Sequence, residues 1–319
     1  MEIKVSVIIP FYKVQDHIAR CARSLMEQTL QEVEFIFVND ASPDGSEKVL
    51  REAIAGYSRK VRVLRHRVNR GLPAARNTGL AAARGEFIYH CDSDDYLEPE
   101  ALELMFRAAE KEMADIAYCD FWLDFGTRRR KMETPTYISA GRMLKEGFLA
   151  GAMKYNVWNK LARRSLYEGL SFPEGHSMGE DMTMILLSIR AAKVVRVAKP
   201  LYHYMKTNSE AFTSKPSDRY LEDIRFNAER VLWVLDAWED PEKEYWTSFF
   251  KLNVKLPFLI SGSLDQYRIW RSWYPEANRF ISANRILPFR TRLVQIFAAL
   301  GLYPLVWLYS QALKIRNGR

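Results

Sequence analysis

The chain has 319 residues, 48% of them hydrophobic, which is enough for a sizeable core and about two domains of ordinary size. Its three cysteines, Cys21, Cys91 and Cys119, are scattered and form no Cys-x-x-Cys pair, which excludes a disulfide framework or a cysteine zinc site and favours a reducing compartment. The net charge of +8 resides almost wholly in residues 279–319, which hold seven Lys or Arg and no Asp or Glu. The body of the chain is therefore balanced, and we expect no nucleic-acid partner.

The N-terminus runs from Met1 directly into a short apolar segment at residues 5–9. This segment is too short for a secretory signal and lacks a basic leader and a cleavage site. We therefore expect the protein to stay in the cytoplasm.

The first 120 residues alternate short β-branched runs with helical stretches, a pattern typical of a doubly wound α/β sheet. The expected strands are apolar on both faces and so read as buried parallel strands; they cover residues 5–10, 33–38, 61–65, 86–90 and 115–119. Helices are expected at residues 16–28 and 46–55, and from Pro99 to about Lys111.

Beyond Phe121 the pattern becomes mixed, and the basic run at residues 128–131 is read as a solvated loop without a catalytic role. From Asp218 to about Arg271 the apolar spacing is helical. We therefore expect a catalytic domain over residues 1–215, with a nucleotide-binding half at 1–120 and an acceptor half at 121–215, followed by a helical extension at 216–319.

Polar clusters follow three of the expected strands, at residues 10–12, 39–46 and 92–95. In an open parallel sheet, ligands bind at the carboxyl ends of the strands, so these clusters share one functional edge. Neither Gly-x-Gly-x-x-Gly nor a P-loop motif occurs, which argues against a dinucleotide dehydrogenase and a P-loop enzyme.

Asp92 and Asp94 are spaced to direct two carboxylates to one place, and such hard oxygen ligands suit Mg²⁺ or Mn²⁺. An ion there would neutralise a departing diphosphate. Because Asp, Ser and Asp are also ordinary loop formers, the pair gains its meaning from its position at a strand end.

Five segments together resemble the inverting GT-A fold glycosyltransferases of family two. They are VSVIIPFY at residues 5–12, SLMEQT at 24–29, VNDASPDGS at 38–46, NRGLPAARN at 69–77 and CDSDD at 91–95. The resemblance is specific over residues 3–120. It continues more loosely through VWNKLARR at 157–164, GED at 179–181 and LYHY at 201–204, and implies a mixed α/β sheet flanked by helices.

On the donor side, the resemblance implies a nucleotide-sugar donor, in the first place a UDP-sugar, bound around Asp92, Ser93 and Asp94. Asp92 would lie near the ribose and Asp94 would ligate the metal. The other donor-side residues are Pro10 and Tyr12 for the base, Asp40 for the pyrimidine N3–H, and Arg76 for nucleotide or phosphate. Alternatives stay open: Pro10 as core packing and Arg76 as a surface cation. Asn39 stands where the family often has a second acid, which weakens the choice of uridine.

On the acceptor side, the resemblance implies that Asp181 is the general base, preceded by Glu180. Trp158 and Lys160 match an acceptor-side motif, and His203 matches a further metal ligand. Each of these residues also has a structural alternative. The two acids could stand at the start of a helix over residues 182–192. Trp158 could pack in the core, and His203 could be a structural histidine.

The stretch at residues 293–309 is apolar and aromatic, is interrupted by Gln295, Gly301 and Pro304, and has basic residues on both sides. It is short for a membrane span and suits a basic amphipathic segment lying on an anionic membrane surface. We expect peripheral attachment on the inner face of the cell membrane; a C-terminal helix packed on the domain is the alternative.

The function favoured by these features is inverting, metal-assisted transfer of a sugar to a glycan or lipid-linked acceptor. A sugar-phosphate nucleotidyltransferase also uses an α/β sheet with metal-binding acids, but residues 6–13 lack the expected glycine-rich basic motif. A catalytically inactive, membrane-associated scaffold of the same fold is the second alternative.

Overall fold

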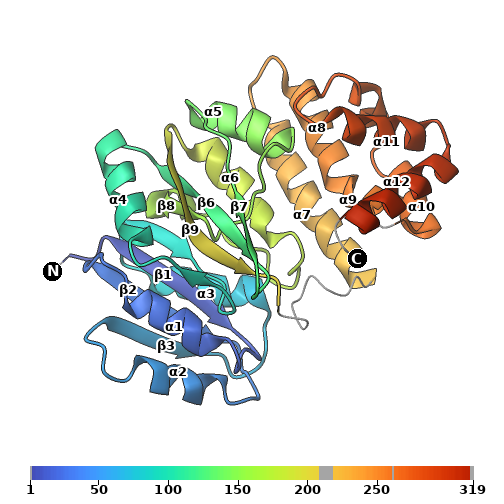
Figure 1. Ribbon diagram of the computed structural model, residues 1–319. Helices are drawn as coiled ribbons and strands as arrows, with labels where there is room; N and C mark the ends of the chain where they lie inside the picture. The colour runs from blue at the N-terminus through green and yellow to red at the C-terminus, as the bar shows by residue number, and fades with distance from the viewer. Residues whose placement is uncertain (1, 208–217, 261, 317–319) are drawn as a thin grey trace. The chain divides into compact units, whose positions relative to one another are not determined.

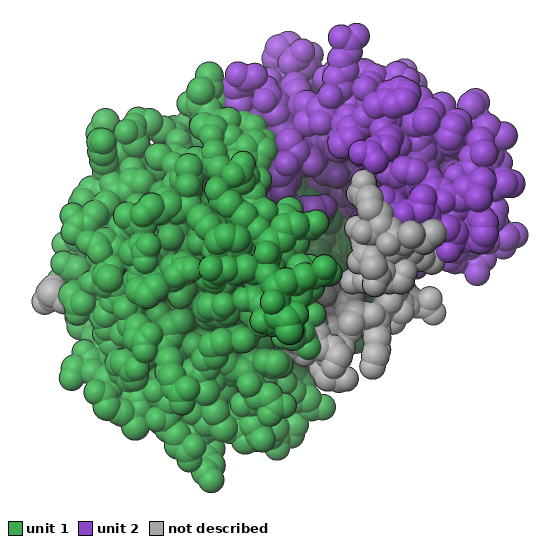
Figure 2. Space-filling model, viewed as in Figure 1, with its two compact units in different colours: residues 1–141, 155–227 green, residues 142–154, 228–319 purple. Residues whose placement is uncertain are grey.

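The computed structural model describes residues 2–207, 218–260 and 262–316, which form two compact units (Figures 1 and 2). Unit 1 comprises Met1–Gly141 and Tyr155–Asn227, and unit 2 comprises Arg142–Lys154 and Ala228–Arg319. The division falls within helix α7 (Asp218–Asp236), and a segment from the middle of the chain joins the helical unit. The sequence predicted a single boundary at residue 215, and that functional division stays a prediction.

Unit 1 contains a mixed sheet in the order β3-β2-β1-β4-β8-β6-β9-β5, with β7 paired to β6 (Figure 1). Its strands are β1 (Val5–Phe11), β2 (Val33–Asn39), β3 (Lys60–Arg65), β4 (Phe87–His90), β5 (Tyr96–Leu97), β6 (Ile116–Asp124), β7 (Arg129–Met132), β8 (Lys160–Arg163) and β9 (Val194–Met205). β1 pairs in parallel with both β2 and β4, so the carboxyl ends of these strands meet at one edge. The α/β fold class predicted from the sequence is present.

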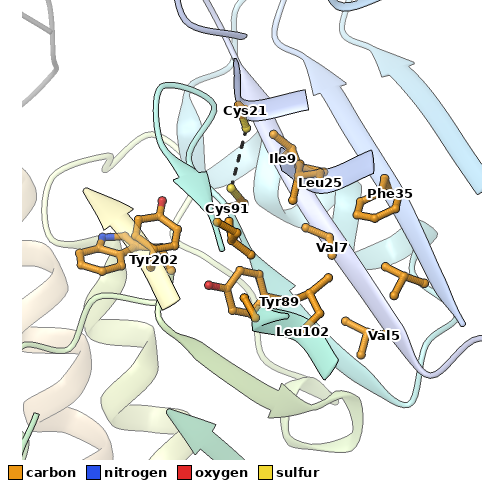
Figure 3. Close-up of a cluster of buried hydrophobic side chains, with 14 of the residues drawn as sticks. Val5, Val7, Ile9, Cys21, Leu25, Phe35, Tyr89, Cys91, Leu102 and Tyr202 are labelled. Atoms are coloured by element: carbon orange, nitrogen blue, oxygen red, sulfur yellow. Dashed lines mark hydrogen bonds between the residues drawn. The ribbon is translucent and has the colours of Figure 1, made fainter. Parts of the chain in front are cut away.

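Alternating side chains of the central strands serve the two faces of the sheet. On one face, Val5, Val7 and Ile9 of β1 join Phe35 of β2 in the main core (Figure 3). Helices α1 (Ile18–Met26), α2 (Ser46–Ile54) and α4 (Ala101–Glu112) contribute buried apolar residues to this cluster. The helical periodicity read from the sequence therefore matches the packed faces.

On the other face, α3 (Leu72–Ala82) lies so close to β1 that a side chain at Gly79 has no room. A Cβ at Gly79 would lie 2.3 Å from Cγ2 of Ile8. This contact places the first turns of α3, including Arg76, beside the carboxyl edge of the sheet.

The second half of the sheet is mixed, as the resemblance to GT-A enzymes implies, and it departs from the sequence prediction in one element. β8 is antiparallel to both β4 and β6, so the sheet is mixed beyond β4. The basic run predicted to be a loop is instead strand β7, antiparallel to β6; the prediction was wrong because exposed basic side chains are compatible with an edge strand.

Several element boundaries also differ from the sequence reading. Pro99 precedes α4 by two residues instead of standing in its first turn. Glu180 and Asp181 lie in a 3-10 turn (Glu180–Met182), after which α6 (Thr183–Arg190) begins. β3 is partly exposed along its whole length, in contrast to the buried strand expected there.

Unit 2 is helical over its described residues. Its elements include a π-helix (Met143–Leu149), α8 (Lys243–Lys255), α9 (Pro257–Ile260), α10 (Leu264–Ser272), α11 (Phe289–Ala299) and α12 (Tyr303–Arg316). The apolar stretch at residues 293–309 is divided between α11 and α12, because Gly301 adopts φ +82° between them. No helix in the described part of the chain is long and apolar enough to cross a membrane.

Candidate active site

The loops that follow β1 and β2 are joined to each other by side-chain hydrogen bonds. The backbone N–H of Lys13 donates to Ser42 Oγ at 2.8 Å, and that of Val14 donates to Ser46 Oγ at 3.0 Å. Lys13 and Ala41 both have positive φ, 52° and 56°, a backbone conformation that non-glycine residues adopt mainly where surrounding contacts enforce it. The two loops therefore form one rigid rim.

The two residues predicted to contact the base, Tyr12 and Pro10, differ in their exposure to solvent. Tyr12, just beyond the end of β1, is 39% exposed, so its ring is accessible to a ligand. Pro10 is buried within β1 opposite Val38, which matches its alternative reading as core packing.

Asp40 is buried, and both of its carboxylate oxygens accept hydrogen bonds. Oδ1 lies 2.6 Å from His66 Nδ1 and accepts the Arg70 N–H at 2.8 Å, while Oδ2 accepts the Gly71 N–H at 2.8 Å. The other ring nitrogen of His66 lies 2.8 Å from Thr78 Oγ1. Asp40 therefore fixes the loop that leads into α3, and its contact with a pyrimidine stays a prediction.

The loop after β4 alternates between partly exposed and buried side chains. Asp92 and Asp94 are partly exposed, whereas Ser93 and Asp95 are buried. Asp95 is held by β9: its Oδ2 accepts from the Tyr202 hydroxyl at 2.7 Å and its Oδ1 accepts from the Met205 N–H at 2.7 Å. Asp95 thus anchors the loop and leaves the two predicted metal ligands on its more open side.

Beneath this loop, the thiols of Cys21 and Cys91 lie 3.9 Å apart in the core (Figure 3). Both thiols also approach the backbone carbonyl of Asp92, at 3.7 and 3.5 Å. Burial raises the pKa of the Cys91 thiol well above its ordinary value. The two buried thiols therefore pack against the start of this loop, at the carbonyl of Asp92.

Arg76 joins the donor-side and acceptor-side acids that the sequence singled out. Its Nη1 donates to Glu180 Oε1 at 2.8 Å and to Asp181 Oδ1 at 2.9 Å, and its Nη2 donates to Asp92 Oδ1 at 3.1 Å. The sequence predicted that Arg76 contacts nucleotide or phosphate. In the structure, its guanidinium group instead binds three carboxylates and is only 1% exposed.

The electrostatics of this acidic cluster are set mainly by burial. Burial and the neighbouring Asp181 raise the pKa of Glu180 to about 8, against the opposing effect of Arg76. Burial likewise raises the pKa of Asp92 to about 6, and Arg76 again opposes the shift. Burial and Asp181 therefore favour the protonated form of Glu180, whereas Arg76 favours its carboxylate form.

The residues present suit a hard divalent cation shared with a ligand. Asp92 and Asp94 offer only oxygen donors, and both are accessible enough to meet a ligand. Among the described residues, no group of three or more His, Cys, Asp and Glu is arranged to hold a metal by itself. A cation here would thus be completed by diphosphate oxygens and water, as is common for Mg²⁺.

His203 does not join Asp92 and Asp94. Its Nε2 lies 2.9 Å from Glu98 Oε1, and its ring stacks on Tyr96 with the centroids 4.0 Å apart. Because side chains alternate along β9, Tyr202 rather than His203 points toward the loop at residues 91–95, called the aspartate loop below. The geometry gives no support to the predicted metal role of His203 and matches its structural alternative.

Trp158 and Lys160 are buried as well. Trp158 is 7% exposed and stacks on Tyr202, with ring centroids 4.5 Å apart. Lys160 Nζ donates to the Asn156 carbonyl at 2.6 Å and to Asn159 Oδ1 at 2.7 Å. These contacts match the core-packing alternative for Trp158, and the acceptor role of both residues stays a prediction.

Sequence reasoning did not identify His66 or the anchoring role of Tyr202. No local motif distinguishes His66, because its partner Asp40 lies 26 residues away in the sequence. Tyr202 belongs to the LYHY segment, but only the register of β9 shows which of its aromatic residues faces the site.

Comparison with known proteins identifies the family of the chain. The family model described as Glycosyl transferase family 2 matches residues 6–184, more than half of the chain. The uncharacterized glycosyltransferase EpsJ of Bacillus subtilis (strain 168) is 34% identical over 222 residues, covering 66% of this chain and 63% of that protein. The putative glycosyltransferase EpsH of the same strain is 35% identical over 209 residues, covering 63% and 60%. The chain thus spans about three fifths of the length of these relatives.

Solved structures share the fold at low sequence identity. Staphylococcus aureus TarS 1–349, solved in complex with UDP-GlcNAc, has a TM-score of 0.72 and 20% identity, covering 99% of this chain and 93% of that one. The mannosyltransferase PcManGT of Pyrobaculum calidifontis, solved with GDP-Man and Mn²⁺, has a TM-score of 0.53 and 16% identity, covering 98% and 84%. The GT-A fold expected from the sequence is confirmed, and the chain belongs to glycosyl transferase family 2.

Proposed function

We propose that this protein transfers a sugar from a nucleotide diphosphate donor, in the first place a UDP-sugar, to a hydroxyl group of a glycan or lipid-linked acceptor. The observation that carries the proposal is the single cluster in which Arg76 joins Asp92, from the donor-side loop, to Glu180 and Asp181, from the acceptor-side turn. In a transferase, the donor sugar and the acceptor hydroxyl must meet. The residues that bind the donor must therefore lie close to the residue that activates the acceptor. Family 2 membership supports the same reading.

The donor-side assignment rests on residues at the carboxyl edge of the sheet. The exposed ring of Tyr12 is available to stack on a base. Asp40 presents only acceptor atoms and would accept the N3–H of uracil, whereas cytosine offers no hydrogen there. The UDP-GlcNAc held by TarS agrees with a uridine donor.

Asp92 and Asp94 would hold Mn²⁺ or Mg²⁺ against the two phosphates of the donor. The bound cation supplies positive charge that stabilises the leaving diphosphate. The Mn²⁺ present with GDP-Man in PcManGT supports a divalent ion at such a site in a related fold.

The chemical step we propose is a single displacement at the anomeric carbon. Asp181 accepts the proton of the acceptor hydroxyl, and the oxygen of that hydroxyl forms a bond to C1 of the sugar. The bond from C1 to the β-phosphate oxygen breaks, and its electron pair leaves with the nucleoside diphosphate. Because attack occurs opposite the leaving group, the configuration at C1 is inverted.

Asp94→Ala tests the donor site. We expect this variant to keep its fold but to lose the rise in melting temperature that UDP with Mn²⁺ gives the wild-type protein, together with donor turnover. A screen of nucleotide sugars with Mn²⁺ on the wild-type protein selects the donor for the turnover assay. Asp16→Ala, at an exposed position, serves as the control. Wild-type turnover by the Asp94 variant would remove the assignment.

The same assay separates the alternative functions. A sugar-phosphate nucleotidyltransferase would release pyrophosphate from a nucleoside triphosphate and a sugar phosphate, and family 2 membership gives this reading no support. An inactive scaffold would bind UDP without turning over any donor. Release of UDP from a nucleotide sugar supports the transferase against both.

We also propose a cytoplasmic location with peripheral attachment to the membrane surface through the C-terminal tail. The support lies in the excess of basic residues in residues 279–319 and in an apolar outer face of α12. Attachment would bring the enzyme to a lipid-linked acceptor.

A further inference from the structure

The environment of Arg76 is unusual for a residue expected to meet a mobile anionic ligand. Its side chain is 1% exposed, and its guanidinium carbon lies 5.4 Å from the centre of the Phe172 ring. Both N–H groups of Nη1 are directed to carboxylates, and Nη2 reaches a third carboxylate. Most of its forked donor set is therefore committed within the protein.

The three carboxylates come from parts of the chain that are far apart. Asp92 follows β4, while Glu180 and Asp181 lie 104 and 105 residues beyond Arg76 in the sequence. Arg76 itself is carried by α3, whose position is fixed by the contact of Gly79 with Ile8. Helix α3 thus places a guanidinium group where the loop after β4 and the turn with Glu180 and Asp181 meet.

Hydrogen bonds to the backbone hold the segment that leads into the turn with Asp181. It is entered through Gly179 at φ +82°, and its preceding backbone is held by Asp223, which accepts the Met178 N–H at 3.1 Å. Asn227 Nδ2 donates to the Met178 carbonyl at 3.0 Å. These bonds place the backbone, whereas the hydrogen bond that orients the Asp181 carboxylate comes from Arg76.

We infer that Arg76 is a positioning residue: it holds Asp181 at a set place relative to Asp92, and so aligns the base with the donor rather than gripping the donor phosphates. The inference rests on the proposed function, in which Asp181 is the base. Arginine suits this role because its planar fork fixes two directions at once, whereas the ammonium group of lysine is a single point charge.

Arg76→Lys tests the inference because it keeps the charge and removes the fork. We expect kcat for release of UDP from the donor, with water as the acceptor, to fall roughly 100-fold, since a displacement of about 1 Å has that effect. The KM for the donor and the Kd for UDP with Mn²⁺ should change less than about threefold. The matched control is Arg163→Lys, which alters another arginine of unit 1 that binds a carboxylate, Glu86.

A double-mutant cycle with Asp181→Asn shows whether Arg76 acts through the base. If it does, adding Arg76→Lys to Asp181→Asn lowers kcat little further. Two results would overturn the inference while leaving Asp181 as the base. One is a decrease in kcat of the double variant equal to the product of the decreases in the two single variants. The other is a Kd for UDP that Arg76→Lys raises tenfold while kcat is unchanged. Undiminished turnover by Asp181→Asn alone would instead overturn the proposed function, and the inference with it.

The double variant Arg76→Lys/Glu180→Gln guards against loss of the fold. Glu180→Gln keeps the side chain at this position uncharged at every pH, so the lysine of the double variant faces only the carboxylates of Asp92 and Asp181. Its kcat is compared with that of Glu180→Gln alone. An unchanged kcat in a folded double variant contradicts the inference, and a fall near that of the single variant supports it.

Discussion

Neighbouring residues of the aspartate loop differ in function because alternate side chains point in opposite directions. Asp94 lies on the more open side, where a cation can meet it, whereas Asp95 is buried and bonded to Tyr202 and Met205. We therefore expect substitution of Asp95 to disturb the fold of the loop, and substitution of Asp94 to affect the cation that we propose it binds. At this scale, the direction of a side chain decides its role more than its chemical type does.

The charge of Lys160 is likewise set by its surroundings more than by its chemical type. Burial lowers its pKa from 10.5 to about 7, although Asp181 opposes the shift. Between these two values the unfolded chain binds a proton that the folded protein does not. We therefore expect the free energy of unfolding to rise with pH from about 7 to 10, by at most about 1.4 kcal/mol per pH unit from this residue.

Lys160→Met isolates this contribution. Urea unfolding of both proteins at several pH values gives the slope of the free energy of unfolding against pH. This slope should be larger for the wild-type protein than for the variant above pH 7. The difference should vanish below pH 7, where both the folded and the unfolded state hold the proton. Equal slopes across the range would show that Lys160 stays charged in the folded state. Lys4→Met, at a partly exposed lysine, is the control.

Helix α3 combines two tasks that depend on each other. One face packs on β1 and β2 through small residues, Ala75 and Gly79, and its second turn carries Arg76 to the edge of the sheet. The helix begins after Gly71 at φ +87°, whose N–H is held by Asp40. The donor-side loop and the acidic cluster are therefore both tied to the seating of this one helix.

Gly79→Ala tests the seating of α3. Alanine normally stabilises a helix by up to about 1 kcal/mol relative to glycine. Here its Cβ would lie 2.3 Å from Ile8 Cγ2, so we expect net destabilisation by about 1–3 kcal/mol, measured by urea unfolding.

The companion substitution Ile8→Ala removes the clashing methyl group, so Gly79→Ala should do less harm in that background than in the wild-type protein. Gly141→Ala, where a Cβ meets no atom within 4 Å, is the control for the alanine itself. A stabilised Gly79→Ala variant would mean that α3 can shift freely, against the account given for Arg76.

The whole molecule combines a catalytic fold with a helical unit that carries most of the excess charge. In α12, Leu305 and Leu308 are 40% and 55% exposed, whereas Val306 and Ser310 are buried. Leu302 and Trp307 add 41% and 44% exposed side chains to the same segment. An outer face of this kind, in a chain end without acidic residues, is the part of the molecule suited to an anionic lipid surface.

Leu305→Ser/Leu308→Ser tests this attachment. We expect the wild-type protein to sediment with vesicles that contain phosphatidylglycerol, less with neutral phosphatidylcholine vesicles, and less again at high salt, which screens the basic residues. The double variant should bind several-fold more weakly while keeping donor turnover. Ile138→Ser, at an apolar residue of unit 1 that is 80% exposed, is the control.

Two results would contradict a lipid surface for α12. One is equal binding of wild-type and variant protein to both kinds of vesicle. The other is a wild-type dimer that the double variant breaks, since this would assign the exposed face to a second copy of the chain.

The sequence predicted five of the strands, β1 to β4 and β6, and singled out Asp92 and Asp94, because these signals are local. Alternating or continuous apolar runs define the strands, and Asp92 and Asp94 follow one of them directly. The faces of β9 could not be predicted, since they depend on a register with β6 that shifts near Asp120. The resemblance therefore implies a metal role for His203 without showing the direction of its side chain, whereas the structure shows that Tyr202 faces the loop.

The contact of Arg76 with Glu180 also lay beyond local reasoning, because 104 residues separate the two in the chain. That separation has a consequence for how the protein matures. Closing so long a loop is entropically unfavourable until intervening strands have paired, so the acidic cluster should be among the last features to assemble during refolding. Secondary structure would then return before the contacts of Arg76 form, and a nascent chain would pair strands β1 to β4 well before its acidic cluster is complete.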